Sequence, residues 1–407
     1  MRAFTDADRV LMADPVFSER YQHAAAHDGR YDGHYVTGWR MSENFCRPGC
    51  ASRTPRPSRV VFYRTAAAAH AAGLLPCPRC RPDMTPPAPE LTTGDSVAVR
   101  ALRLIADGEI DRRGVSGVAK KVGVTPRHLL RAVELHADCG PLDIARAGRA
   151  RLARLLLTST ALPMRDVALG AGFTSVRQFN STILDLYRVT PGVIRFGPRR
   201  AASVPREPGP LVVRCVLPAL RPIPADVFAD LADGAVPEVE EGADHWFART
   251  VRLPHGAGHA RIDVDGSGRL LARLTVADLR DFTPLMHRVG QLVVGWGAAA
   301  DTVQAPGATD QTEALIRAVL RRHAATPVAR TMLGGMVAAL GEVTPWGRLF
   351  PTARAIAESG SAILRGPRER VDAVLRVAGA LASGRIDVDA GWSWQALLDR
   401  HAVALGL

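Results

Sequence analysis

The chain has 407 residues, 23% of them charged, and carries a formal net charge of +12 at neutral pH. It contains no run of eighteen apolar residues and its amino terminus is polar, which excludes a transmembrane helix and a secretory signal and predicts a cytoplasmic protein with no membrane partner. Residues 1–200 hold 30 Lys and Arg against 18 Asp and Glu, whereas residues 201–407 hold 22 against 22, so the basic first half predicts nucleic-acid binding.

Two pairs of cysteines stand out in the first hundred residues. Three residues separate Cys46 from Cys50, two separate Cys77 from Cys80, and twenty-six lie between the pairs. This spacing is typical of a tetrahedral four-thiolate zinc site, in which the spacer forms a small domain that the metal holds together. Disulfides remain an alternative, and spacing does not distinguish a structural zinc from a reactive thiolate. The sequence therefore predicts Zn²⁺ bound by these four cysteines.

The residues around the cysteines resemble the amino-terminal domain of the Ada family of self-methylating DNA-repair and adaptive-response proteins. The matching segments are YDGHYV at 31–36, FCRPGC at 45–50, ASRTPRP at 51–57 and PCPRCRPD at 76–83. The resemblance implies that Cys46 attacks the methyl group of a methyl phosphotriester in the DNA backbone, and that Cys50, Cys77 and Cys80 complete the metal site. It also implies that Arg53 lies near the phosphate.

Methylation is expected to act as an electrostatic switch. A four-thiolate zinc site has a formal charge of −2 and repels DNA, and methylating one sulfur removes one negative charge, so DNA affinity should rise. One departure from the family lies just before Cys46, where the usual Thr-Gly-Ile-aromatic run is replaced by SENF at 42–45. Glu43 places a carboxylate where the phosphate should approach. With Asn44, it motivates an alternative: a DNA-binding regulator with a purely structural zinc.

A linker rich in Pro and Thr is predicted at 84–95, followed by helices. Residues 116–131 contain a short helix that ends at Gly123, which can adopt the positive φ of a tight turn. Thr125 can cap the next helix, which has Pro126 at its first position. This arrangement predicts a helix-turn-helix.

A second such motif is predicted at 164–179, with Gly172 at the turn and Thr174 as the cap of the following helix. A longer helix at 142–157 joins the two motifs. Such a pair resembles the AraC-type DNA-binding domain, assigned here to residues 86–200.

The second motif, continued to residue 191, is especially close to the version attached to Ada proteins. The resemblance implies double-stranded DNA, at a damaged backbone and at a promoter operator, as the partner, with RNA polymerase as a further partner. Exposed positions of the two recognition helices are expected to contact DNA. These candidates are Arg127, His128, Arg131, Ser175, Arg177 and Asn180.

The pattern changes after a second proline-rich linker at 197–210. Alternating apolar runs punctuated by Gly and Pro predict strands at 211–213, 246–253 and 269–276. Helices are predicted from residue 310 onward, at 313–323, 328–340 and 366–382.

This half resembles the 3-methyladenine DNA glycosylase II (AlkA-like) family. Segments 242–262 and 274–282 resemble its amino-terminal sheet domain, and segments 350–357 and 383–391 fit its helical domain. The family's helix-hairpin-helix and catalytic aspartate would come after residues 402–407, and its Gly-Gln-Gln signature is replaced by RRH at 321–323. We therefore expect a truncated or degenerate glycosylase region without base excision. The alternative function is a 3-methyladenine glycosylase-type base excision repair protein.

The expected function is an alkylation-damage response regulator that accepts a methyl group once per chain and then activates transcription. The expected fold is a multidomain α+β protein. Its parts are a small zinc-binding α/β domain at 1–85, an all-α double helix-turn-helix domain at 86–200, a β-rich sheet domain at 208–300 and a partial helical glycosylase-like domain at 310–407.

Overall fold

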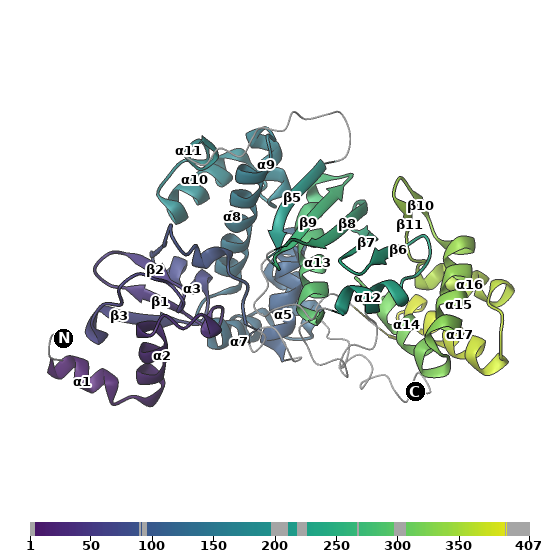
Figure 1. Cartoon of the computed structure of the whole chain (residues 1–407), viewed down its shortest axis with the longest axis horizontal. Helices are drawn as coiled ribbons and strands as arrows, with labels where there is room; N and C mark the ends of the chain where they lie inside the picture. The colour runs from purple at the N-terminus through teal and green to yellow at the C-terminus, as the bar shows by residue number, and fades with distance from the viewer. Residues whose placement is uncertain are drawn as a thin grey trace. The chain divides into compact units, whose positions relative to one another are not determined.

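The computed structural model describes residues 5–88, 91, 96–196, 211–217, 226–266, 268–296, 307–386 and 388. The predicted linker at 197–210 and the segment 402–407 lie outside these residues. The chain forms two compact units, Met1–Val204 (unit 1) and Pro205–Leu407 (unit 2), and Figure 1 shows that both mix helices and strands. The predicted α+β class is therefore confirmed at this level. In the described part of the chain, no helix combines the length and apolarity that crossing a bilayer demands.

The first part of unit 1 is built on a four-stranded sheet. Its strands are β1 (Val36–Trp39), β2 (Asn44–Cys46), β3 (Val60–Tyr63) and β4 (Leu75–Pro76), in the order β3-β1-β2-β4. β1 pairs antiparallel with β2 and β3, and β2 pairs parallel with β4. The short helices and turns around the sheet are α1 (Asp6–Met12), α2 (Pro15–Ala25), η1 (Gly29–Tyr31), η2 (Pro57–Arg59), α3 (Ala66–Ala71) and η3 (Pro82–Met84).

The alanine-rich run between the cysteine pairs forms α3. Thr65 caps this helix by accepting a hydrogen bond from Ala68 N, which satisfies one of the free amides of its first turn. Small side chains let the helix approach the sheet closely, and Ala69 packs with Val36 and Phe45 in a small core. This core fixes β2, and hence the position of the first cysteine pair.

The second part of unit 1 is all helical. Its helices are α5 (Val97–Ala106), α6 (Glu109–Val122), α7 (Pro126–Ala137), α8 (Pro141–Ser159), α9 (Met164–Gly170), α10 (Val176–Tyr187) and α11 (Pro191–Phe196). The first predicted motif is confirmed: Gly123 ends α6 with φ 82°, and Thr125 caps α7 ahead of Pro126. α8 contains the predicted joining helix, and its buried face includes Ala150, Ala153 and Leu156.

The second motif is confirmed with one correction. Gly172 has φ 84° between α9 and α10, as predicted. The cap of α10 is Ser175, whose hydroxyl accepts from Gln178 N, and not Thr174. Thr174 instead donates its hydroxyl to Gln178 Oε1 over 3.1 Å. Both residues can cap a helix, and the sequence does not reveal which of two adjacent hydroxyls reaches the third amide.

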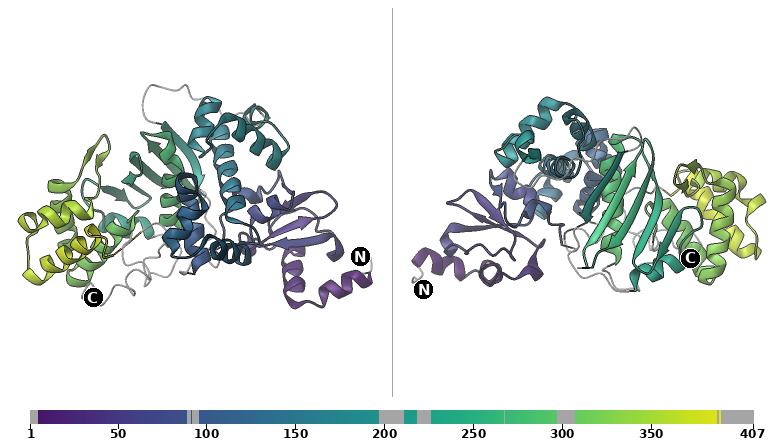
Figure 2. Two further views of the ribbon diagram at one scale, coloured as in Figure 1. Left: turned by 180° about the vertical axis from the view of Figure 1, so that it is seen from behind. Right: turned by 45° about the horizontal axis from the view of Figure 1, so that its top comes forward.

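Unit 2 begins with an antiparallel sheet that Figure 2 shows with its strands side by side. The strands are β5 (Leu211–Leu217), β6 (Glu240–Ala243), β7 (Trp246–Leu253), β8 (Gly256–Val264) and β9 (Leu270–Val276), in the order β5-β9-β8-β7-β6. The predicted strand at 246–253 matches β7. Three further elements complete this part: α12 (Val227–Asp233), η4 (Leu279–Asp281) and α13 (Phe282–Trp296).

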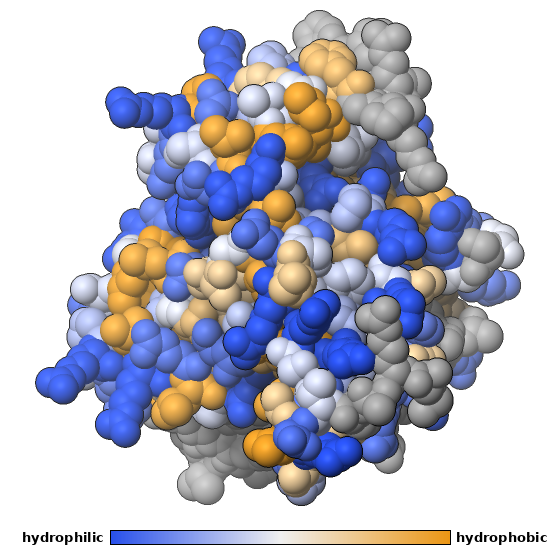
Figure 3. Space-filling model, turned by 90° about the vertical axis from the view of Figure 1, so that its left-hand side faces the viewer, coloured by the Kyte–Doolittle hydropathy of each residue, from blue (hydrophilic) through white to orange (hydrophobic). Residues whose placement is uncertain are grey.

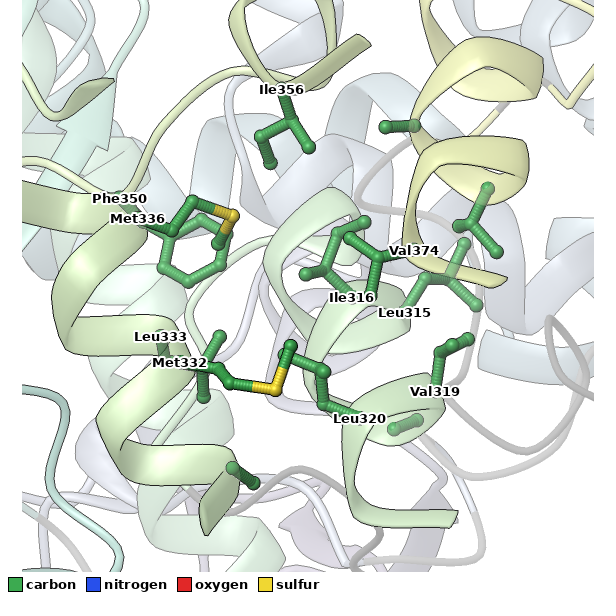
Figure 4. Packing of buried hydrophobic residues seen from close by; sticks show 14 of the residues in the cluster. Leu315, Ile316, Val319, Leu320, Met332, Leu333, Met336, Phe350, Ile356 and Val374 are labelled. Atoms are coloured by element: carbon green, nitrogen blue, oxygen red, sulfur yellow. The ribbon is translucent and has the colours of Figure 1, made fainter. Parts of the chain in front are cut away.

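The rest of unit 2 is mainly helical, with α14 (Gln311–His323), α15 (Thr326–Leu340), α16 (Ala353–Ile363) and α17 (Arg368–Ala382), and a short hairpin of β10 (Val343–Thr344) and β11 (Gly347–Arg348). The three predicted helices are confirmed to within two residues as α14, α15 and α17, whereas α16 was not predicted. α14 begins earlier than predicted because Asp310 caps it. Its buried face packs with Met336, Phe350 and Val374 in one core, shown in Figure 4.

A buried set of four charged side chains joins the sheet of unit 2 to its helices. Arg249 of β7 donates to Glu240 of β6 over 2.9 Å and to Glu313 of α14 over 2.8 Å. Arg317 of α14 donates to both carboxylates as well. Each of these side chains is at most 3% exposed. The two positive and two negative charges neutralise one another inside the protein, which offsets the cost of removing them from water.

Candidate metal centre and nucleic-acid interface

The four predicted zinc ligands come together between β2 and β4. Cys46 is the last residue of β2, and Cys50 closes a turn in which its amide donates to Arg47 O over 3.1 Å. Cys77 follows β4, and its amide donates to Phe45 O over 2.9 Å. This bond ties the second cysteine pair to the strand that carries the first, so both pairs face the same point.

The arrangement fits a zinc ion. The four Sγ atoms all lie within 4.8 Å of one another. A tetrahedral site with Zn–S bonds of about 2.3 Å places its sulfur atoms about 3.8 Å apart, so little movement is needed. All six cysteines of the chain are free thiols, and the alternative of disulfides is therefore wrong. Zinc is the cofactor for which this donor set is suited.

The electrostatics of the four thiols also favour a bound cation. The hydrogen bond to Cys80, burial and repulsion by the neighbouring thiolates all raise the pKa of the Cys46 thiol. The same hydrogen bond stabilises the thiolate of Cys80 and lowers its pKa to about 6. Four negative charges cannot share this volume without a counterion. A divalent cation at the centre supplies it, and thiols bind such a metal as thiolates.

Asp32 holds the turn between Cys46 and Cys50, a role that the sequence analysis did not predict. Asp32 Oδ2 accepts from Arg47 Nη1 over 2.6 Å, and Asp32 Oδ1 accepts from Gly49 N over 2.8 Å. Gly49 also lies so close to Gly29 that an added Cβ would stand 2.7 Å from its Cα. Contacts outside the cysteine cluster therefore hold this turn.

A second supporting contact reaches Cys50. Its Sγ lies 3.1 Å from Ser52 Oγ, and Ser52 is 4% exposed. Arg79, between Cys77 and Cys80, donates to the same hydroxyl. When Cys50 is a thiolate, the hydroxyl donates to the sulfur while accepting from the guanidinium. Ser52 and Arg79 therefore stabilise negative charge on Cys50. The spacing of the cysteines does not reveal this role.

The residues just before the proposed nucleophile take an unusual backbone conformation. Glu43 is exposed and has φ 52°, in the left-handed region that glycine occupies at little cost. Its carbonyl accepts from Leu75 N over 2.7 Å, which holds this conformation in place. Cys46 itself is only 2% exposed, and Trp39 packs against the cysteine cluster. Cys80 is the most exposed of the four ligands.

The predicted DNA-contacting side chains all lie at the surface of unit 1. Arg53 is exposed three residues after Cys50. The exposed candidates of α7 and α10 are Arg127, His128, Arg131, Arg177 and Asn180, with Ser175 at the cap of α10. Figure 3 shows hydrophilic side chains over much of one face of the molecule, with hydrophobic ones in separate patches. Their contacts with DNA remain predictions.

The metal centre and the helix-turn-helix part are joined through Asp83, three residues after Cys80. Asp83 Oδ2 accepts from Arg154 Nη1 of α8 and from the hydroxyl of Tyr187 of α10, each over 3.1 Å. Asp83 is 6% exposed. Nearby, Arg64 N donates to Asp138 Oδ2 over 2.8 Å, a second link to the helices. The two parts of unit 1 thus share a polar interface.

Comparisons with known proteins match both parts of unit 1 and most of the chain. The metal binding domain of Ada matches residues 19–83, and a helix-turn-helix domain matches residues 118–196. A probable bifunctional transcriptional activator/DNA repair enzyme AlkA of Mycobacterium tuberculosis is 36% identical over 405 residues, covering 93% of this chain and 81% of the relative. The bifunctional transcriptional activator/DNA repair enzyme Ada of Escherichia coli is 30% identical over 155 residues, covering 38% of this chain and 42% of the relative.

Among solved structures, the crystal structure of the methylated N-ADA/DNA complex is 30% identical, with a TM-score of 0.17, and covers 33% of this chain and 98% of that chain.

Proposed function

We propose that this chain converts methyl damage in the DNA backbone into a transcriptional signal, since it belongs to the family of bifunctional transcriptional activators and DNA repair enzymes that its AlkA and Ada relatives represent. The chain is a DNA alkylation-response regulator with a zinc-binding domain and a helix-turn-helix domain. The observation that carries the proposal is the set of four Sγ atoms within 4.8 Å of one another, in the same compact unit as the two helix-turn-helix motifs.

Cys46 is the methyl acceptor in this proposal. The thiolate is the reactive form of cysteine, and zinc, when bound, keeps the thiols deprotonated at neutral pH. The sulfur of Cys46 forms a bond to the methyl carbon of a phosphotriester while the bond from that carbon to the phosphate oxygen breaks. The electron pair of the broken bond stays on the oxygen, which leaves a phosphodiester anion. Cys46 becomes a neutral thioether, and each chain reacts once.

Two features of the site determine how the reaction proceeds. Ser52 and Arg79 stabilise negative charge on Cys50, so Cys46 keeps the more nucleophilic sulfur. Cys46 is 2% exposed, so side chains packed on the cluster, Trp39 among them, have to move before a phosphotriester reaches the sulfur.

The regulatory output follows from charge. Loss of one negative charge from the cysteine cluster lowers its repulsion of the DNA backbone, and backbone binding is dominated by charge. Arg53 contacts phosphate, and exposed side chains of α7 and α10 contact an operator in double-stranded DNA. RNA polymerase is the further partner, and the protein acts in the cytoplasm at the nucleoid.

For unit 2, we propose two glycosylase-II-like parts, at 208–300 and 310–407, that do not excise bases. The five-stranded sheet and the helices α14 to α17 of this unit support it. Base excision of 3-methyladenine is the alternative function, and the relative's printed name as a DNA repair enzyme favours keeping it under test.

The deciding experiment is intact-protein and peptide mass spectrometry of the zinc-loaded chain after incubation with methylated duplex DNA. We expect a gain of one methyl group, located on Cys46. A Cys46→Ser variant should gain none, whereas Cys139→Ser, which removes a buried cysteine outside the cluster, should behave as wild type. An adduct on the more exposed Cys80 would overturn the role of Cys46 but not that of the domain.

Absence of any adduct on folded, zinc-loaded protein would favour a regulator with a structural zinc. Release of methylated bases from the same DNA is measured in parallel. Base release without a protein adduct would replace the proposed function by base excision repair.

A further inference from the structure

Among the helices that the structure describes in unit 2, none covers one face of its sheet. The other face carries the buried side chains, among them Val213, Leu274 and Ile262, and α13 packs there with Phe282 and Leu285. On the uncovered face, side chains alternate with these and point away from the core. Val212 and Val216 of β5 are 48% and 51% exposed, and Arg214 between them is exposed.

Three arginines lie directly opposite one another on this uncovered face, one on each of three neighbouring strands. Arg214 of β5 pairs in register with Arg273 of β9, and Arg273 pairs with Arg261 of β8. We call these three residues the arginine row. With strands about 4.8 Å apart, the row is about 10 Å long. Like charges directly opposite each other destabilise a sheet, so their presence calls for a partner of the opposite charge.

Carboxylates on the same face neutralise only one end of the row. Arg261 pairs with Asp263 over 3.0 Å and stacks on the ring of Trp246 at 3.9 Å. Glu241 shares this face at its far edge, because it pairs in register with Ala248, the neighbour of Arg261. Among the residues that the structure describes, Arg214 and Arg273 make no ion pair.

A general excess of positive charge in unit 2 does not explain the arginine row. Residues 201–407 carry 22 basic and 22 acidic side chains, a balance of zero, so the positive charge at Arg214 and Arg273 is local. A polyanion has the right sign, and duplex DNA is the polyanion that the helix-turn-helix domain brings to this protein.

We propose that the uncovered face of the unit 2 sheet binds the phosphate backbone of duplex DNA through Arg214 and Arg273. This contact is independent of base sequence, because guanidinium groups on phosphates carry no sequence information. Unit 2 thereby adds DNA affinity to the regulator without excising bases. The inference goes beyond the proposed function and does not depend on methyl transfer to Cys46.

The test measures the affinity of the full, zinc-loaded chain for duplex DNA by fluorescence anisotropy across a series of salt concentrations. Each phosphate contact contributes about 0.9 to the slope of log affinity against log salt. Arg214→Ser combined with Arg273→Ser should lower the slope by about 2 and weaken binding about tenfold or more at low salt, equally for operator and unrelated sequences. Arg214→Lys with Arg273→Lys should keep the wild-type slope.

The matched control is Arg354→Ser combined with Arg376→Ser. These two arginines are exposed on α16 and α17 and make no ion pair among the described residues, so the control removes the same charge from another surface of unit 2. It should leave the slope unchanged. Equal slopes for all variants, or equal losses in test and control, would overturn the proposal.

Sedimentation of the same variants distinguishes a different occupant. If the serine double variant changed the association of the chain with itself while the DNA slope stayed constant, the face would be an interface between copies. That result would also overturn the proposal. Failure of the wild-type chain to bind any DNA would instead remove the proposed function together with this inference.

Discussion

The hydroxyl of Tyr187 donates a hydrogen bond to Asp83 Oδ2 over 3.1 Å, which joins the last residue of α10 to the segment that follows the last zinc ligand. Arg154 of α8 donates to the same oxygen, and its guanidinium also lies 5.1 Å from the centre of the Tyr187 ring. One buried carboxylate therefore organises contacts with two helices of the DNA-binding part. The metal centre is therefore linked to α10 through Asp83, which lies three residues after Cys80.

We expect Asp83→Ala to lower the free energy of unfolding of the chain by about 3 kcal/mol or more, because it leaves the charge of Arg154 without its buried partner. Tyr187→Phe should cost about 1.5 kcal/mol, the loss of one hydrogen bond to a charged group. Urea unfolding followed by circular dichroism measures both. The control is Asp185→Ala, which breaks the exposed pair with Arg146 and should cost less than about 1 kcal/mol. Similar losses for Asp83→Ala and Asp185→Ala would show that Asp83 does not organise the interface.

Ser52→Ala should weaken zinc binding by about tenfold or more, because it removes the hydroxyl that contacts Cys50 and leaves Arg79 without that acceptor. Competition with a chromogenic chelator measures the affinity. Ser42→Ala, a change at an exposed position just before the site, should bind zinc as wild type does. If both variants matched wild type, Ser52 would have no role in holding the metal.

Glu43→Gly should stabilise the chain by about 1 kcal/mol, because glycine adopts φ 52° without the strain of a side chain. It should also speed methyl transfer to Cys46, because it removes a carboxylate near the approaching phosphotriester. Glu43→Gln separates the two effects: it removes the charge and keeps the strain. We expect Glu43→Gln to raise the rate without raising stability, as measured by adduct formation over time and by thermal unfolding. Slower transfer in Glu43→Gln would mean that the carboxylate assists the reaction.

His70 makes the stability of unit 1 depend on pH. Burial lowers the pKa of His70 from 6.5 to about 4, with Asp83 acting in the opposite direction. Because the unfolded chain takes up this proton at higher pH than the folded one, stability is complete above pH 6.5 and decreases as pH falls towards 4. The loss at pH 5 should be about 2 kcal/mol. His70→Phe keeps an aromatic ring beside Phe45 and Tyr187.

Comparing unfolding free energies of wild type and His70→Phe at pH 7.5 and pH 5 isolates this effect, since acid also releases zinc from thiolates in both proteins. We expect the wild type to lose about 2 kcal/mol more than the variant. Parallel losses would show that His70 does not titrate in this range.

Methylation of Cys46 should make the affinity for promoter DNA depend more steeply on salt. The modified cluster carries one negative charge fewer, so more phosphates can be neutralised by the surrounding arginines, each adding about 0.9 to the slope. Anisotropy titrations of methylated and unmethylated chain on one operator measure the difference. Methylation on Cys46 with an unchanged slope would separate methyl transfer from the charge switch.

The spacing of Cys46, Cys50, Cys77 and Cys80 was sufficient to predict the metal cluster, because ligand pairs at short separations are local properties of the chain. The same holds for Gly123 and Thr125, because the turn and the helix cap depend on only a few neighbouring residues. Local patterns also predicted β7 and the helices α14, α15 and α17 of unit 2.

Contacts between distant segments were not predictable in this way. Nothing near Asp32 or Asp83 in the sequence indicates that one holds the cysteine turn and the other binds Tyr187, 104 positions away. The register that aligns Arg214, Arg273 and Arg261 depends on strand pairing, which no single strand encodes. The choice of Ser175 over Thr174 as cap depends on side-chain geometry at adjacent positions. Sequence patterns therefore predicted the metal centre, whereas only the fold shows which distant side chains support it.

The buried set of Arg249, Glu240, Glu313 and Arg317 determines where unit 2 can be divided. A fragment cut between the sheet and α14 would keep Arg249 and Glu240 on one side and lose Glu313 and Arg317 to the other. Each piece would then expose charged groups in the middle of an apolar surface, and neither would be a good candidate for separate expression or for fusion to another domain. The sheet and helices of unit 2 are therefore best treated as one structural module.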